Sequence, residues 1–133
     1  MPKSGEVYWG RIEYKDFGSS LKLFLVLHVD IPSDRIIVCI VTKVAKEKDK
    51  HRAFGCNVAT QRFLVEASRE FFELNTYIEL LRFKEWRLKE FIACVPKVYE
   101  CKFILPPKLL NDIKDCLKRL VDDIAPDFQG VLL

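Results

Sequence analysis

The chain has 133 residues, half of them apolar, and this length favours one domain over residues 1–133 with a sizeable core. Its formal net charge of +3 is too small to indicate a nucleic-acid binder by itself. No apolar run approaches the roughly 20 residues of a membrane span, and residues 1–10 have no apolar signal region, so we expect neither membrane insertion nor export.

The first three predicted elements are strands. Residues 6–14 form the first, which a glycine- and serine-containing break ends. Residues 21–30 are almost continuously apolar, as in a strand buried on both faces. The segment IPSD then predicts a turn, and the β-branched run at residues 35–43 predicts the third strand. Because the connections are too short for parallel crossovers, we expect an antiparallel meander.

The middle of the chain is less regular. Residues 56–65 predict a weaker strand, and residues 66–75 predict either a turn with a short strand or a helical turn. Residues 76–86 favour a long strand, although a helix over residues 70–86 is an open alternative. A short helix at 87–95 and a strand at 98–105 follow.

The last element has the clearest pattern. Apolar residues recur at helical spacing over residues 106–124, behind a Pro-Pro pair that suits the entry to a helix. We expect this amphipathic helix to pack on the sheet or on a partner chain. The apolar tail at residues 127–133 is expected to dock as well, either on the same chain or across a dimer.

Cysteine and histidine usage bears on cofactors and compartment. The five cysteines are odd in number and contain no CxxC pair, which argues against a disulfide framework or a zinc site and for reduced thiols in a cytoplasm. Cys39 and Cys116 fall on apolar positions and are interpreted as small core residues. His28 and His51 share no metal spacing, so we expect no metal and no other cofactor.

The third strand ends at Thr42, where a charged segment begins. Residues 43–52 contain five positive and two negative residues, so this segment alone carries +3. Such a patch attracts phosphate, but mixed charge runs are more often solvated loops. The threonine likewise has two interpretations, as an ordinary strand residue or as the edge of a pocket.

Four segments together resemble one known family. GEVYWGRIEY at residues 5–14 looks like its opening Gly-Asp/Glu-Ile/Val-x-Trp strand, and KLFLVLHVD at 22–30 sits where the family has Arg-Pro-x-Leu-Val-Leu. IIVCIVTK at 36–43 resembles its Val-x-Val-x-Pro-Ile-Thr-Ser strand, and TYIELLRFKEW at 76–86 is similar in position to Ser-Tyr-Val-x-x-Asp-Gln-x-Arg. The family is MazF/PemK (Kid), the toxin ribonucleases of toxin–antitoxin systems. The resemblance implies an α+β fold: a small antiparallel SH3-like β-barrel with a C-terminal amphipathic helix.

The chain departs from that family at several positions. Lys22 replaces the arginine that opens the second strand, and Leu23 replaces the following proline. Leu81 and Arg82 replace the Asp-Gln pair, while Thr42 is retained. Exchanging arginine for lysine loses the planar fork that binds phosphate in two places, so transition-state stabilisation should weaken.

The resemblance also implies a function. Family members cleave single-stranded RNA without a metal, by attack of the ribose 2′-OH on the adjacent phosphorus. Thr42 would orient the phosphate and Lys22 would supply the cation, so these are the candidate catalytic residues. The candidate nucleic-acid-binding residues are Lys43, Lys46, Lys48, His51, Arg52, Arg82 and Lys84. The implied partners are a second copy of the chain and an acidic antitoxin, with no membrane, in the cytoplasm.

The departures keep a second hypothesis open. A non-catalytic SH3-like barrel of the same descent would act as a protein- or nucleic-acid-binding module. Arg82 and Lys84 alternate with Phe83 and Trp86, which suits a basic-aromatic strip for single strands but also suits an ordinary amphipathic strand.

Overall fold

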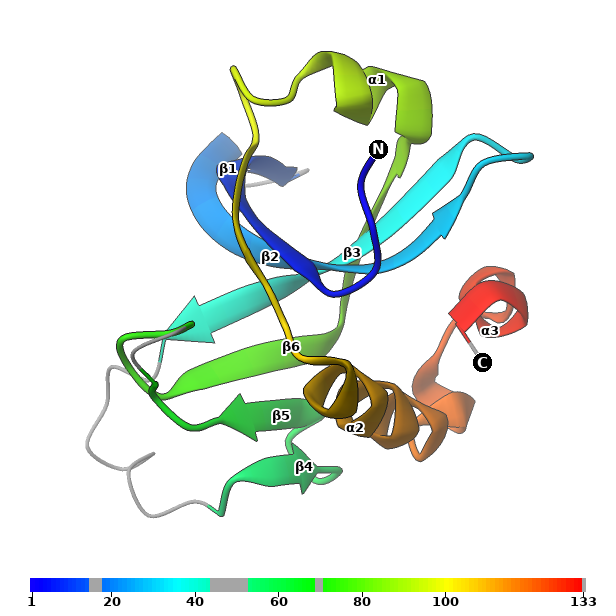
Figure 1. The fold of residues 1–133 in the computed structure, drawn as a ribbon. Helices are drawn as coiled ribbons and strands as arrows, with labels where there is room; N and C mark the ends of the chain where they lie inside the picture. The colour runs from blue at the N-terminus through cyan, green and yellow to red at the C-terminus, as the bar shows by residue number, and fades with distance from the viewer. Residues whose placement is uncertain (15–17, 44–52, 69–70, 133) are drawn as a thin grey trace.

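A computed structural model describes residues 1–14, 18–43, 53–68 and 71–132, with main chain alone for Tyr14 and Lys43. Over these ranges the protein is a small α+β fold dominated by a seven-stranded antiparallel sheet, accompanied by three α-helices (Figure 1). The ladder does not close on itself, and its strand order is β4 (Gly55–Asn57), β5 (Arg62–Val65), β6 (Thr76–Arg87), β3 (Arg35–Lys43), β2 (Gly18–Asp30), β1 (Glu6–Tyr14) and β7 (Glu100–Ile104). The edges of the sheet are therefore β4 and β7.

The predicted meander is confirmed. β1 (Glu6–Tyr14), β2 (Gly18–Asp30) and β3 (Arg35–Lys43) pair antiparallel in sequence order, and residues 31–34 form the expected turn. β2 is buried on both faces at its centre, where residues 24–27 are all at most 1% exposed. A register shift between Val26 and His28 interrupts its pairing with β3. From Leu23 to Val26 the pairing of β2 with β3 is regular, and Lys22 and Thr42 lie just beyond this part of the ladder.

The predicted single strand at residues 56–65 is wrong, because the segment is a hairpin. β4 (Gly55–Asn57) and β5 (Arg62–Val65) are separated by a turn in which the Thr60 N–H donates to Asn57 Oδ1 at 3.2 Å. Gln61 closes the turn at φ 58°, in the left-handed region. An asparagine followed by a left-handed residue therefore breaks what the apolar residues alone suggested was continuous.

Residues 66–75 contain neither the helix nor the strand that were considered, within the part that the structure describes. Side chains satisfy their main chain instead. Asn75 Oδ1 accepts from the Ala67 N–H at 2.9 Å, and Ser68 Oγ accepts from the Phe71 N–H at 3.2 Å.

The remaining elements follow the prediction closely. β6 (Thr76–Arg87) is the long strand, which excludes the helical alternative, and α1 (Leu88–Ala93) and β7 (Glu100–Ile104) are the expected short helix and strand. The pairing of β6 with β3 shifts register in the middle: Phe83 lies opposite Cys39, whereas Ile78 lies opposite Val41. Its first half also pairs with β5.

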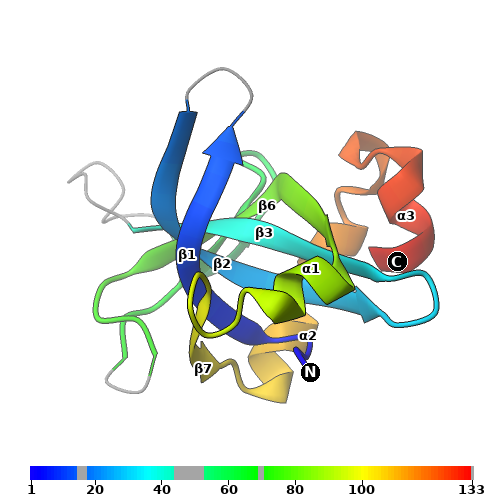
Figure 2. The same cartoon turned by 90° about the horizontal axis from the view of Figure 1, so that it is seen from above.

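Each face of the sheet has its own core. On one face an aromatic cluster joins Tyr8, Phe24 and Phe91 to Tyr99, whose ring approaches so closely that a Cβ on Gly10 would lie 2.3 Å from it. α1 covers this face. α2 (Pro107–Lys118) covers the other, where its buried residues join the larger core (Figure 1, Figure 2).

The C-terminal helix is shorter than its apolar pattern. α2 ends at Lys118, a 3₁₀ turn follows at Val121–Asp123, and the tail forms a further helix, α3 (Pro126–Leu132). α2 packs on the sheet of its own chain through Ile113 and Leu117. α3 lies beside the β2–β3 hairpin (Figure 2), and Phe128 contacts Phe83 with ring centroids 5.2 Å apart.

The expectation of reduced thiols throughout is contradicted by one pair. Cys56 of β4 and Cys116 of α2 form a disulfide across 60 residues. Cys116 is buried in the core as predicted, but it is bonded there. The cysteine count and spacing do not show which distant segments meet in the fold. α2 follows β7 at one edge of the sheet but packs against β4 at the opposite edge, and this brings Cys116 to Cys56. Within the described residues no helix is long and apolar enough to cross a membrane.

Candidate functional site

Lys22 and Thr42 are neighbours on the sheet. β1, β2 and β3 run side by side with Gly10 opposite Lys22 and Leu23 opposite Val41. The ladder of β2 with β3 ends at that pair, and following the same register one residue further puts Lys22 opposite Thr42, on one face. Directly opposite Cβ atoms lie about 4.5–5.5 Å apart in such ladders. The structure thus brings together the two residues to which the sequence analysis assigned chemistry.

Both residues also border a cavity of about 350 Å³, whose other described lining residues are Trp9, Leu21, Leu23 and Val41. By alternation Trp9, Leu23 and Val41 project from the opposite face to Lys22 and Thr42, so the two sets meet at this cavity from the two faces of the sheet. Trp9 is 37% exposed, which leaves part of an aromatic surface open for stacking.

The polar face continues across two more strands. Tyr77 of β6 lies directly opposite Thr42, and the guanidinium of Arg62, from β5, lies 4.7 Å above the centroid of the Tyr77 ring. Arg62 is paired with Glu79, two residues further along β6. We call Lys22, Thr42, Tyr77, Arg62 and Glu79 the polar row.

Arg62 and Glu79 form a partly buried ion pair. Arg62 Nε lies 2.8 Å from Glu79 Oε1, while its aligned hydrogen bond goes to Oε2 at 3.2 Å. The Glu79 side chain is 9% exposed and that of Arg62 is 36% exposed. The carboxylate therefore holds the cation in place from within the sheet, and the cation keeps access to solvent.

Unpaired polar atoms concentrate at this end of the molecule. Within the described residues, four buried side-chain oxygens have no hydrogen-bond partner: Thr42 Oγ1, Thr60 Oγ1, the Tyr77 hydroxyl and Glu79 Oε1. Three belong to the polar row, and Thr60 lies in the turn just before Arg62. Glu79 Oε1 is still in ion-pair contact with Arg62 Nε at 2.8 Å. Buried hydroxyls without a partner are rare and costly, and they mark places where a ligand can supply the missing partner.

The polar row suits an anion better than a metal. It offers two cations and two hydroxyl donors against one carboxylate, which is already paired. Burial raises the pKa of the Cys39 thiol, and the negative charge of Glu79 raises it further. No group of three or more metal-ligating side chains occurs in the part of the chain that the structure describes.

The predicted nucleic-acid-binding residues fall into two sets. Those of the basic loop, Lys46, Lys48, His51 and Arg52, lie outside the described residues, and Lys43 is described by its main chain alone at the end of β3. Arg82 and Lys84 lie on β6. Lys84 is opposite Val38, four residues before Thr42, and donates from Nζ to the Glu13 carbonyl at 2.8 Å. The structure therefore does not place Lys84 in the polar row.

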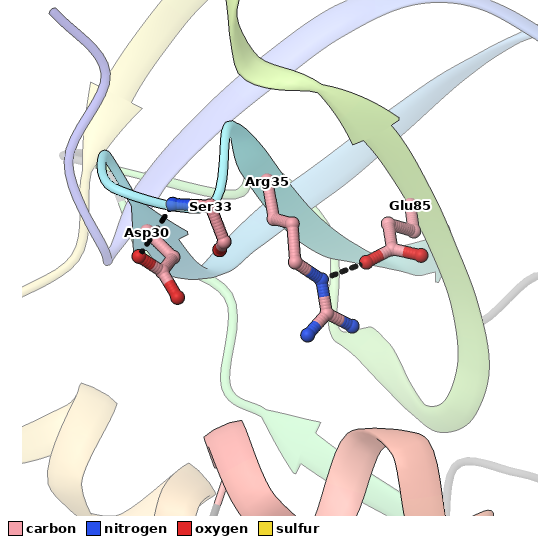
Figure 3. A network of polar contacts seen from close by, with 4 residues as sticks. All are labelled: Asp30, Ser33, Arg35 and Glu85. Carbon is pink, nitrogen blue, oxygen red and sulfur yellow. Dashed lines mark hydrogen bonds and ion pairs between the residues drawn. The ribbon is translucent and has the colours of Figure 1, made fainter.

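A cavity of about 580 Å³, larger than the one beside Thr42, lies at the other end of β3, by the β2–β3 turn. Three of its four charged lining residues, Asp34, Arg35 and Glu85, are engaged in structural contacts. Arg35 Nε pairs with Glu85, and at the adjoining end of β2 Asp30 accepts from the Ser33 N–H at 3.3 Å (Figure 3). Hydrogen bonding from the Ser33 side chain, followed by that from its N–H, lowers the pKa of Asp30. Asp34 accepts from α1. Size alone therefore does not make this cavity the candidate site.

Sequence reasoning missed Arg62, Tyr77 and Glu79. Tyr77 and Glu79 alternate in a strand that was predicted, so their shared face could have been inferred. Nothing in the sequence indicated that this face adjoins Thr42, because that depends on the pairing of β6 with β3. Compared with models of known protein families and with curated proteins, the chain matches none.

Proposed function

We propose that the protein binds single-stranded RNA at the polar row and cleaves it without a metal, as a toxin of the MazF/PemK type. The observation that carries the proposal is the juxtaposition of Lys22 and Thr42 on neighbouring strands, beside a cavity with a partly exposed tryptophan. A hydroxyl donor, an ammonium and an aromatic surface are the groups that a phosphate and a base require.

The proposed reaction is an internal transfer. The ribose 2′-oxygen forms a bond to the adjacent phosphorus and the bond to the 5′-oxygen breaks, which leaves a 2′,3′-cyclic phosphate and a 5′-hydroxyl. A base removes the 2′ proton, and an acid supplies one to the departing oxygen. Thr42 would donate to a phosphate oxygen, and Lys22 would stabilise the charge that accumulates in the transition state.

The barrel character of the fold belongs to the same proposal. The strand ladder is open, but Phe71 and Phe72, just before β6, contact Phe103 of the β7 edge with ring centroids 5.6 and 5.0 Å apart. α2 runs from β7 towards β4, where the disulfide ties it. These contacts support an SH3-like barrel that side chains complete where main-chain pairing stops.

The proposed partners follow from the resemblance. They are a second copy of the chain and an acidic antitoxin protein that would cover the cationic face. The proposed location is the cytoplasm, where the RNA is. The proposed RNA substrate supports this location. The cysteines do not, because Cys56 and Cys116 form a disulfide.

The test is cleavage of an end-labelled single-stranded RNA by the purified chain in the presence of EDTA. We expect fragments with 2′,3′-cyclic phosphate ends, and losses of roughly tenfold or more for Thr42→Val and for Lys22→Gln. Lys114→Gln, on the α2 helix, is the matched control and should cleave like the original chain. Intact RNA under these conditions, with EDTA replaced by Mg²⁺ as a further arm, rejects ribonuclease activity.

A second function is favoured by a specific observation. The described residues around the cavity include one cation and neither a carboxylate nor a histidine that could transfer a proton. A binding module without catalysis needs no such group. Retention of labelled RNA without cleavage, lost in Lys22→Gln, would identify this alternative.

A further inference from the structure

Arg62 is a cation fixed in position by two independent contacts. The Glu79 carboxylate holds its Nε, and the Tyr77 ring lies 4.7 Å below its guanidinium carbon. A flexible surface arginine loses considerable side-chain entropy when it binds a ligand, whereas a side chain held in advance loses less. Because the Glu79 contact is made by Nε, it does not consume the two terminal Nη groups, which can bind two oxygens of one phosphate.

The groups beside Arg62 are hydrogen-bond donors that lack acceptors. The Tyr77 side chain is buried, in a residue 2% exposed, and its hydroxyl has no partner in the described part of the chain. The same holds for Thr42 Oγ1, opposite Tyr77 on β3. One unpaired hydroxyl belongs to the tyrosine under the guanidinium and the other to the next strand, so both are donors that an oxyanion would satisfy.

An ion pair of purely structural role looks different in this molecule. Arg35 and Glu85 are also an arginine–glutamate pair, which joins β3 to β6, with side chains 27% and 38% exposed. Neither residue lies beside a buried hydroxyl without a partner, among the residues described. The Arg62–Glu79 pair differs by its buried carboxylate, its aromatic platform and its unpaired neighbours.

We propose that Arg62, with the hydroxyls of Tyr77 and Thr42, forms a phosphate-binding subsite that extends the Lys22–Thr42 pair across β6 to β5. The inference rests on the proposed function, since the phosphate is a backbone phosphate of the same single-stranded RNA. Glu79 is a positioning residue: it holds the guanidinium and does not touch the RNA. Arg62 thereby supplies the planar cation that Lys22, in place of an arginine, does not.

The test measures binding of a short fluorescent single-stranded RNA by anisotropy over a range of salt concentrations. Arg62→Gln should weaken binding roughly ten- to hundredfold, the value of a lost charge-assisted hydrogen bond. It should also reduce the salt dependence by about 0.7 in log K against log salt, which is one phosphate contact to a single strand. Arg62→Lys should restore the salt dependence but not the full affinity.

Arg35→Gln is the matched control, because it breaks the other arginine–glutamate pair and should change neither quantity. Glu79→Gln should weaken binding less than Arg62→Gln, with an unchanged salt dependence. Circular dichroism and melting of each variant show whether it is folded, and Tyr77→Phe tests the subsite without touching the ion pair. If Arg62→Gln binds RNA with the same affinity and salt dependence as Arg35→Gln, the subsite is wrong, although the protein still binds RNA.

Inorganic phosphate separates this inference from the proposed function. If the original chain binds no RNA, the proposed function fails. A phosphate-dependent rise in melting temperature that Arg62→Gln abolishes and Arg35→Gln keeps would then still support an anion site. Absence of both RNA binding and the phosphate effect rejects both.

Discussion

Two hydroxyl groups on neighbouring strands, those of Thr42 and Tyr77, are buried with no hydrogen-bond partner in the described chain. An unpaired buried hydroxyl costs about 1–3 kcal/mol. Two such hydroxyls at one place therefore lower the stability of the protein. Ligand binding would explain their presence, since functional sites commonly reduce stability.

Removing either hydroxyl should stabilise the protein. We expect Thr42→Val and Tyr77→Phe each to raise the free energy of unfolding by about 1 kcal/mol while weakening RNA binding. Urea unfolding measures the first quantity. Thr76→Val is the control on the same strand: its Oγ1 donates to the Leu74 carbonyl at 2.8 Å, so its loss should destabilise by about 1 kcal/mol. A destabilised Tyr77→Phe variant would contradict the assignment of its hydroxyl as unpaired.

Cys101 should be unusually unreactive for an exposed thiol. Burial of the sulfur, followed by the charge and hydrogen bond of Glu6, raises its pKa to about 11. Since the thiolate is the reactive form, its alkylation rate should climb about tenfold per pH unit from pH 8 to pH 10 without levelling off. Glu6→Gln should lower the pKa and speed alkylation at pH 8 several-fold, as mass spectrometry of the Cys101 peptide would show. Glu13→Gln, on the same strand, should leave the rate unchanged, and equal rates in both variants would exclude the Glu6 effect.

The short helix α1 depends on the turn between β2 and β3. Its own N-cap, Arg87, makes no capping hydrogen bond with its side chain. Asp34 serves instead: its carbonyl accepts from the Leu88 N–H at 3.1 Å, and its Oδ1 accepts from the Lys89 N–H at 2.9 Å. Asp34 has φ 55°, a left-handed conformation that aspartate and asparagine tolerate better than most residues.

This arrangement predicts different costs for two substitutions at one position. Asp34→Ala loses the cap and strains the backbone, so we expect a loss of about 1–2 kcal/mol in unfolding free energy. Asp34→Asn keeps an acceptor and the tolerated conformation, and should lose less than half as much. Urea unfolding of both variants checks the order, and equal losses would show that the side-chain cap contributes nothing.

The molecule as a whole is held together across its two sheet edges. α2 starts beside β7, packs under the sheet and is bonded to β4 through Cys56–Cys116. A cross-link over 60 residues removes conformational freedom from the unfolded chain. In the chain-entropy account a loop of this length is worth about 4 kcal/mol.

Reduction should therefore lower the unfolding free energy by roughly 2–4 kcal/mol, measured by urea unfolding with and without a phosphine reductant. Cys56→Ala should be insensitive to the reductant. Thiol titration of the denatured, unreduced protein should find the three free thiols Cys39, Cys94 and Cys101. Five titratable thiols, or equal stability under both conditions, would contradict the cross-link.

Local patterns in the chain were enough for most of the elements. β1, β3 and β6 could be predicted because strand character depends on alternation and β-branching within a few residues. α2 could be predicted from its apolar stripe. The β4–β5 hairpin could not, since its turn depends on an Asn57 side-chain hydrogen bond and a left-handed Gln61 within an apolar stretch.

The candidate site divides in the same way. The resemblance singled out Thr42 and Lys22, and their closeness could be predicted because β2 and β3 are joined by a short connection. Arg62 and Glu79 reach the same face only through the pairing of β6 with both β3 and β5, and Cys56 meets Cys116 only because α2 crosses between the sheet edges. Local periodicity selects an element because neighbouring residues share one backbone geometry. Which elements meet is settled by packing between segments tens of residues apart, and that information is in the register and the core of the folded chain.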